Sequence, residues 1–251
     1  AGFQIAIFAF VGVELVGTAA AETKDPERNL PKAVNSIPIR IIIFYVLSLV
    51  IVMSVTPWNK IDPSISPFVN LFSQAGIAAA AIIMNLVVLS SVMSSMNSGV
   101  FSTSRMLFGL SREEQGPKAF GRLNKRAVPA NALYFSAICL LLGAGLQYFV
   151  PNAIEAFTLA TTLSTILFIC VWLMIMWSYI VYYKTRPELH AKSTFKLPGG
   201  LISCWVVIIF FISIIYVLSL EADTMRALMV SPIWLVILII GYYGFYKPKH
   251  K

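Results

Sequence analysis

The feature that most constrains this chain is the alternation of long uncharged stretches with short clusters of charge. About 20 consecutive apolar residues in a helix cross the roughly 30 Å hydrocarbon core of a bilayer. Because 58% of its residues are hydrophobic and its mean hydropathy is +0.81, the chain is predicted to be an all-α polytopic membrane protein. We predict seven transmembrane helices, at residues 2–21, 37–58, 76–101, 130–150, 156–183, 201–220 and 228–246.

The placement of basic residues predicts the orientation of these helices. Of the 19 lysine and arginine residues, 16 lie in the tail and in the segments after the first, third and fifth spans, and Arg40 lies in the first turn of the second span, next to the first of these segments. Only Lys60 and Arg226 lie on the opposite side. By the positive-inside rule those segments are cytoplasmic, so the first residue is expected outside a plasma membrane and the tail inside. The basic residues on the cytoplasmic side are Lys24, Arg28, Lys32, Arg40, Arg105, Arg112, Lys118, Arg122, Lys125, Arg126, Lys184, Arg186, Lys192, Lys196, Lys247, Lys249 and Lys251.

The same distribution explains the net charge of +8 as a topology signal, so no nucleic-acid partner is expected. An external first residue fits two architectures, a complete seven-span protein or a fragment whose earlier spans are missing. We expect the fragment, because no start methionine or signal sequence precedes the first span. The charged, proline-containing segment at 22–31 is expected to form a loop.

Glu14 is an ionisable residue about twelve residues into the first apolar stretch. Charged groups inside a bilayer are costly, so they usually face a protein interior or a water-filled path. Gly12 and Gly17 flank Glu14, and each weakens a helix by about 1 kcal/mol relative to alanine. A break there would free backbone groups at mid-membrane, which are tolerated only inside protein or along a cavity, as in the discontinuous helices of secondary transporters.

Two readings of Glu14 follow from the residues alone. It is either a structural acid that hydrogen-bonds the broken backbone, or a proton site that loads and unloads as a cavity faces each side of the membrane. Glu22 lies at the cytoplasmic boundary of the same span, where a loop anchor or gate residue is expected.

Two other spans carry stripes of polar residues. Ser94 and Asn97 share a stripe of the third span, and Thr161 and Thr165 share a face in the outer half of the fifth. Small hydroxylated residues allow helices to pack closely and to hydrogen-bond across their interface. The alternative is that Ser94 and Asn97 line a polar cavity and the threonines an external vestibule.

Several motifs resemble bacterial permeases of the amino acid–polyamine–organocation superfamily. FAFVGVELVG at 8–17, with AAE at 20–22 and NLPKA at 29–33, resembles their sixth helix and the loop after it. VVLSS at 87–91 and MNSGVFSTSRMLFGL at 96–110 resemble the eighth helix. The resemblance covers essentially all 251 residues. Within the superfamily, the D-serine/D-alanine/glycine proton symporters are the most similar subgroup, through PKAF at 117–120, KRAVP at 125–129 and LHAKS at 189–193.

The resemblance implies a twelve-helix transporter with an inverted five-plus-five repeat and two further helices. This chain, a single transmembrane domain over residues 1–251, would supply helices six to twelve, and the amino-terminal helices would be its missing partners. The implied activity is proton-coupled import of small neutral amino acids such as D-serine, D-alanine and glycine. The implied partners are that substrate, protons and the lipid bilayer, and neither a cofactor nor a metal is expected.

The resemblance also implies roles for individual residues. Carbonyls near Phe8 and Val11 would bind the substrate amino group, Phe8 would cover the cavity, Gly12 would keep the break open, and Glu14 would couple protons. The implied substrate-binding residues are Phe8, Ala9, Phe10, Val11, Gly12, Ser94, Asn97, Thr161, Ser164 and Thr165.

Three other classes of protein compare less well with the sequence. A sodium-coupled transporter is the nearest alternative, because Ser94 and Ser95 could offer hydroxyl ligands to an ion. A seven-span ligand receptor also fits the predicted topology. A seven-span retinal protein does not, because retinal attachment needs a lysine inside a span and every lysine lies outside the predicted spans. An enzyme is not expected, because the sequence contains no HExxH pair, no histidine within a span and no glycine-rich phosphate loop.

Overall fold

A computed structural model describes residues 2–18, 23–62, 65–76, 78–146 and 153–246 of the chain. These residues form helices joined by turns and short extended segments, and none of them forms a strand. The chain divides into two compact units, one of Ala1–Glu14 with Met106–Lys251 and the other of Leu15–Arg105. The predicted all-helical class is confirmed for the described residues, and each unit is considered separately below.

The first predicted span is an interrupted helix, as expected. Helix α1 covers Gly2–Phe8 and helix α2 covers Leu15–Thr18, with turns at residues 9–14 between them. Gly12 lies in this interval with φ = 108°, a backbone conformation that residues with a Cβ rarely adopt. The glycine therefore permits the interruption that its position in the sequence predicted.

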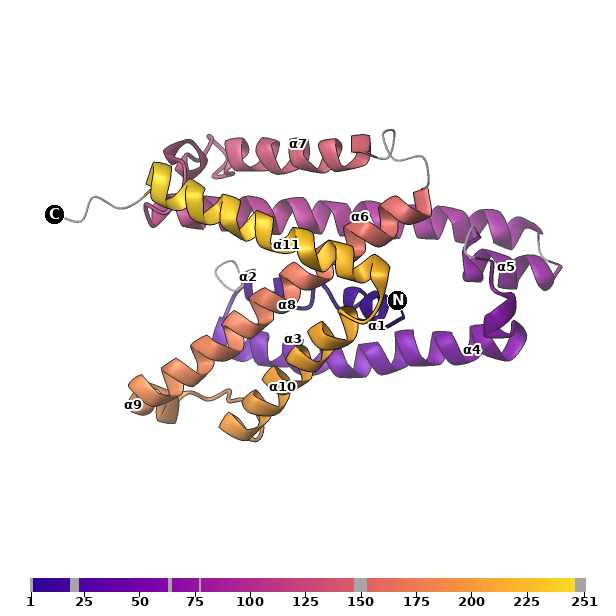
Figure 1. Ribbon diagram of the computed structural model, residues 1–251, viewed down its shortest axis with the longest axis horizontal. Coiled ribbons are helices and arrows are strands. Elements are labelled where there is room, and N and C mark those ends of the chain that lie inside the picture. The colour runs from indigo at the N-terminus through magenta and orange to yellow at the C-terminus, as the bar shows by residue number, and fades with distance from the viewer. Residues whose placement is uncertain (1, 19–22, 63–64, 77, 147–152, 247–251) are drawn as a thin grey trace. The chain divides into compact units, whose positions relative to one another are not determined.

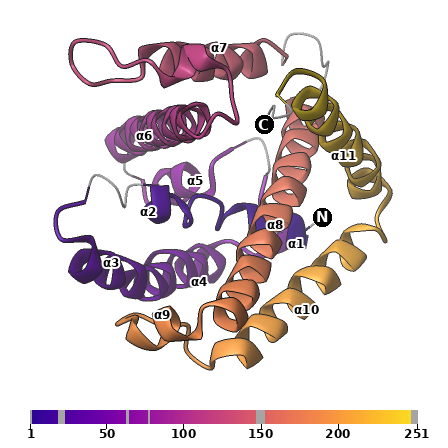
Figure 2. The ribbon, with the colours of Figure 1, turned by 90° about the vertical axis from the view of Figure 1, so that its left-hand side faces the viewer.

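The first unit is organised around one long helix, α8 (Ala153–Thr185). Helices α1, α10 (Gly200–Leu218) and α11 (Ala222–Gly241) all contact α8 (Figures 1 and 2). The unit also contains α7 (Ala130–Leu146), α9 (Pro187–Lys192), and two short turns, η4 (Lys118–Gly121) and η5 (Tyr242–Tyr246). Its main apolar core is formed by Ile7, Ile166, Ile169, Ile214, Leu218 and Ala227. The core joins the broken helix to α8, α10 and α11.

The second unit contains one proline-rich helix that is longer than predicted. Helix α3 (Pro26–Ile41) continues through the π turn η2 (Ile42–Val46) into α4 (Leu47–Val55). The loop expected at 22–31 is therefore wrong from Pro26 onward, and the helix that contains the predicted span at 37–58 begins eleven residues before it. Hydropathy detects only the bilayer-crossing part of a helix, and Pro26 in the first turn lacks only an N–H that would be unpaired anyway.

The rest of the second unit leads into α6. Turn η3 (Trp58–Lys60) and helix α5 (Pro67–Gln74) precede α6, which covers Ala78–Arg112 and has its last turns in the first unit. Helix α2 contacts α3, and Thr18 Oγ1 donates a hydrogen bond to Ser102 Oγ of α6 at 3.3 Å. The span predicted at 76–101 corresponds to α6, which continues eleven residues further, to Arg112. A helix of this length can project past the surface of a bilayer.

Five of the described helices are long and apolar enough to cross a membrane, which makes this a multi-pass membrane chain. The other two predicted spans do not reach this length as single described helices. The first is interrupted between α1 and α2. The fourth corresponds to α7, which is apolar but shorter, and residues 147–150 of this span lie outside the described residues. The helices predicted at 156–183, 201–220 and 228–246 correspond to α8, α10 and α11. The five qualifying segments are Pro26–Val55, Ile82–Arg112, Phe157–Thr185, Gly200–Leu218 and Ala227–Gly244.

Candidate functional site

The candidate site is the interrupted backbone between α1 and α2. Tight turns replace the helical hydrogen-bond ladder here: Phe10 N–H donates to the Ile7 carbonyl and Val11 N–H to the Phe8 carbonyl, both at 3.0 Å. Val13 N–H donates to the Phe10 carbonyl at 3.3 Å. Each carbonyl oxygen carries two lone pairs, so the Phe8 carbonyl can still accept a second donor. The break therefore presents peptide groups in an otherwise apolar setting.

The Glu14 carboxylate is hydrogen-bonded to this broken backbone. Gly12 N–H donates to both Glu14 Oε1 and Oε2 at 3.1 Å, and Trp172 Nε1 of α8 donates to Oε2 at 3.4 Å. A carboxylate in its ionised form only accepts hydrogen bonds, and bonds to a charged acceptor are stronger than neutral ones. Glu14 is half-buried and links the break to α8.

A second polar contact joins α1 to α8 one turn before the break. Gln4 Nε2 donates to Thr161 Oγ1 at 2.7 Å, and Thr165 Oγ1 donates to the Gln4 carbonyl at 3.4 Å. Gln4 and Thr165 are fully buried and Thr161 nearly so. The polar face predicted on the fifth span is therefore turned toward α1, and its hydroxyls form helix–helix hydrogen bonds.

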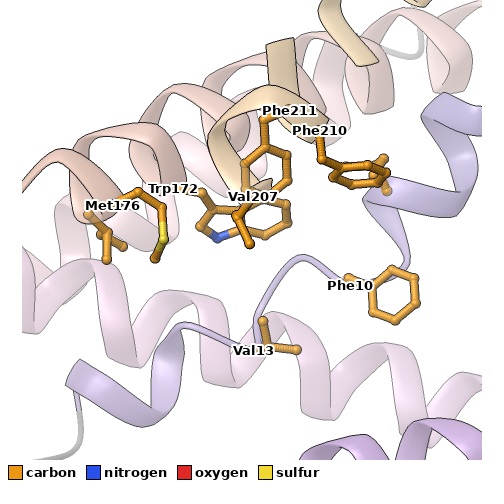
Figure 3. Close-up of a pocket in the computed structure, with 9 residues that line it drawn as sticks. Phe10, Val13, Trp172, Met176, Val207, Phe210 and Phe211 are labelled. Atoms are coloured by element: carbon orange, nitrogen blue, oxygen red, sulfur yellow. The ribbon is translucent and has the colours of Figure 1, made fainter. Parts of the chain in front are cut away.

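An apolar cavity of about 490 Å³ lies beside the break within the first unit. Phe10 and Val13 from the turns face Trp172 of α8 and the aromatic side chains of α10 across it (Figure 3). An amino-acid zwitterion would leave its charges unpaired there, which is costly, so this cavity is not a site for the ammonium and carboxylate groups of a substrate. The lining residues are Ile7, Phe10, Val13, Trp172, Ile175, Met176, Val207, Phe210 and Phe211.

The structure brings together some of the predicted site residues and places others elsewhere. Phe8 ends α1 and is half-buried, and residues 9–12 form the turns that follow it. Ser164 is half-buried on α8. Ser94 and Asn97 are exposed on the part of α6 that belongs to the second unit. Glu22 lies outside the described residues, so its predicted role is not addressed by the structure.

Two residues of the site were not singled out from the sequence. Gln4 had a detectable signal, because a buried amide in an apolar span needs a hydrogen-bond partner. Trp172 had none, because a tryptophan within an apolar helix does not reveal that its indole N–H meets a carboxylate on another helix. Among the described residues, no group of three or more His, Cys, Asp or Glu side chains is positioned to hold a metal ion.

Comparisons with known proteins agree with this architecture. The whole chain, residues 1–251, matches the family described as amino acid permease. It is 60% identical over 242 residues to the D-serine/D-alanine/glycine transporter of Escherichia coli O6:H1 strain CFT073, covering 96% of this chain and 52% of that protein. The protein of the same name in strain K12 is 59% identical, with the same coverage. The amino-acid permease AapA of Bacillus subtilis strain 168 is 43% identical over 249 residues, covering 99% of this chain and 54% of that protein. The chain thus spans about half the length of the curated relatives it matches.

The conformation of Gly12 generates a first testable prediction. Gly12→Ala should lower the free energy of unfolding by about 1–3 kcal/mol, because alanine is strained at a φ of 108°. Gly17→Ala is the matched control, since Gly17 lies in α2 and an added Cβ there meets no atom within 4 Å. Thermal unfolding of the purified full-length protein in detergent measures both. Equal midpoints for the two variants would contradict the role assigned to Gly12.

Proposed function

The chain belongs to the amino acid permease family, and we propose that it is the carboxyl-terminal half of a proton-coupled importer of small neutral amino acids. The observation that carries the proposal is the 60% identity, along 96% of the chain, to a protein named as a D-serine/D-alanine/glycine transporter. The interrupted helix with a carboxylate bound to its backbone supports the same class of activity, because secondary transporters bind solutes at such breaks.

The proposal includes an amino-terminal half that completes the binding site. The relatives are about twice as long as this chain, which supports five further helices preceding the interrupted one. With the basic loops in the cytoplasm, residue 1 of this chain lies on the outer side of the plasma membrane and the tail on the inner side. The amino-terminal half then provides the remaining wall of the solute site.

In this proposal, the substrate ammonium group binds the peptide carbonyls at the end of α1. The Phe8 carbonyl already accepts the Val11 N–H and has one lone pair left, and the C-terminal end of a helix favours a positive charge. Phe8 covers the bound solute, and Ser94, Asn97 and Ser164 are proposed as further contacts. Thr161 and Thr165 do not contact the substrate in this proposal, because their hydroxyl groups already bond Gln4 and carbonyls of α8. They affect the site indirectly, by holding α1 in place.

Proton coupling is proposed to act through the Glu14–Gly12 contact. In its ionised form the carboxylate accepts from Gly12 N–H with both oxygens and from the Trp172 indole with one. A proton on either oxygen adds an O–H donor there, leaves fewer lone pairs to accept, and removes the charge that strengthens these bonds. Protonation therefore loosens the hold of Glu14 on the break, so that the proton and the shape of the solute site depend on each other.

Uptake by the full-length permease tests the function and its coupling ion together. Proteoliposomes with an inward proton gradient in sodium-free buffer should accumulate labelled glycine or D-alanine, and should accumulate little when the gradient is dissipated. Uptake that requires sodium and does not depend on the proton gradient would favour sodium coupling. An absence of amino-acid uptake under all gradients would refute the proposed function.

Glu14→Gln should separate accumulation from exchange. The glutamine carbonyl can still accept the Gly12 N–H, but it carries no charge and no titratable proton. Proton-driven accumulation should fall by about tenfold or more, whereas exchange of external for internal substrate should persist, as expected when a proton-transfer group is lost. Glu27→Gln, an exposed acid at the start of α3, is the control and should leave both unchanged. Equal loss of accumulation and exchange, or loss of neither, would argue against a coupling role.

Phe8→Ala should weaken substrate binding if Phe8 covers the solute. Removing the ring should raise the apparent KM roughly tenfold, the equivalent of about 1.4 kcal/mol of lost contact, and relax selectivity toward larger amino acids. Phe3→Ala is the matched control, because Phe3 lies on the same helix and its side chain is 59% exposed. Initial uptake rates across a substrate series measure both effects, and unchanged kinetics for Phe8→Ala would dismiss the covering role.

A further inference from the structure

We infer that Gln4 is a positioning residue of the transporter, which fixes α1 to α8 and so sets where the broken segment begins. This inference rests on the proposed function, because its consequence is measured as transport. The hydrogen bonds of Gln4 with Thr161 and Thr165 are called the Gln4 clamp below.

The clamp holds both the side chain and the backbone of one residue. Gln4 Nε2 donates to Thr161 Oγ1 at 2.7 Å and lies 3.5 Å from the Thr158 carbonyl. The single proton of the Thr165 hydroxyl is shared between the Thr161 carbonyl at 2.8 Å and the Gln4 carbonyl at 3.4 Å, so the contact with the Gln4 backbone is the weaker of the two attachments. The two threonines are one helical turn apart on α8. Two attachment points on a single residue restrict the rotation of α1 as well as its separation from α8.

The direction of the central hydrogen bond follows from the local geometry. The Thr161 hydroxyl donates to the Phe157 carbonyl at 2.8 Å, so its oxygen meets Gln4 with a lone pair. In this arrangement the oxygen accepts from the amide nitrogen of Gln4, and the Thr158 carbonyl 3.5 Å from that nitrogen favours the same amide orientation. An apolar side chain at this position could not form the bond.

The burial of the Gln4 amide is not explained by packing alone. Gln4 is fully buried, and no donor among the described residues reaches its Oε1, so the burial of the amide is only partly compensated by hydrogen bonds. An apolar side chain of similar length would pack there without that cost. The advantage of the amide therefore lies in the specific geometry it imposes on α1.

The clamp and the Glu14 contact hold the two ends of the break on the same helix. Thr161 meets Gln4 one turn before α1 ends, and Trp172 meets Glu14 after the turns. On α8 the two contacts are eleven residues apart, or about three turns and roughly 16 Å. Only the Glu14 contact involves a titratable group. The neutral clamp thus keeps α1 in place while the Glu14 end responds to the proton.

Substitutions in the full-length permease test the clamp, with transport kinetics and thermal unfolding measured on each variant. Thr161→Val and Gln4→Met should each raise the apparent KM for glycine roughly tenfold, with a smaller change in the maximal rate, as expected for one lost hydrogen bond. Thr161→Ser retains the hydroxyl and should restore the KM to within about twofold. Thr162→Val is the matched control: Thr162 is equally buried, but its hydroxyl bonds only the Thr158 carbonyl of its own helix.

The double variant Gln4→Met with Thr161→Val separates positioning from stability. Replacing both partners by apolar groups should recover most of the thermal stability lost in the single variants. The KM should stay raised, because the apolar pair does not fix the rotation of α1. A wild-type KM in the double variant, or in Thr161→Val alone, would overturn the clamp while leaving the proposed function intact. Failure of the wild-type permease to transport amino acids would instead refute the proposed function and the clamp with it.

Discussion

The rest of the site depends on one requirement: backbone groups released inside a bilayer must find partners within the protein. At the break, Glu14 meets this requirement by accepting the Gly12 N–H with both carboxylate oxygens. The interaction explains why an acid and a glycine lie two residues apart in an apolar segment. It also ties an irregular stretch of backbone to one side chain, whereas a regular helix pairs its own peptide groups.

Helix α8 holds the segments on both sides of the break in place. It contacts α1, α10 and α11, and its own side chains supply the groups that meet both Gln4 and Glu14. Packing between membrane helices relies on close contact and on hydrogen bonds more than on the hydrophobic effect, since lipid is as apolar as leucine. The threonines of α8 contribute to that packing in the amino-terminal half of the helix, and Trp172 contributes further along.

Hydropathy, charge distribution and the spacing of Gly12, Glu14 and Gly17 were sufficient to predict the membrane class and the interrupted first helix. They did not predict the full length of α3, because the part of a helix beyond the bilayer carries no hydropathy signal and Pro26 and Pro31 suggested a loop. The partners of Gln4 and Glu14 on α8 escaped prediction. They lie more than 150 residues away in the sequence, and only the packing of α1 on α8 brings them together.

The apolar cavity beside the break has a consequence for the route by which protons travel. Its lining offers almost no group to hydrogen-bond water. The ring of Trp172 is part of that lining, while its N–H reaches Glu14. The carboxylate thus has an apolar neighbour on the side of the cavity. In the proposed transporter, water that brings a proton to Glu14 would be held by polar groups on the opposite side.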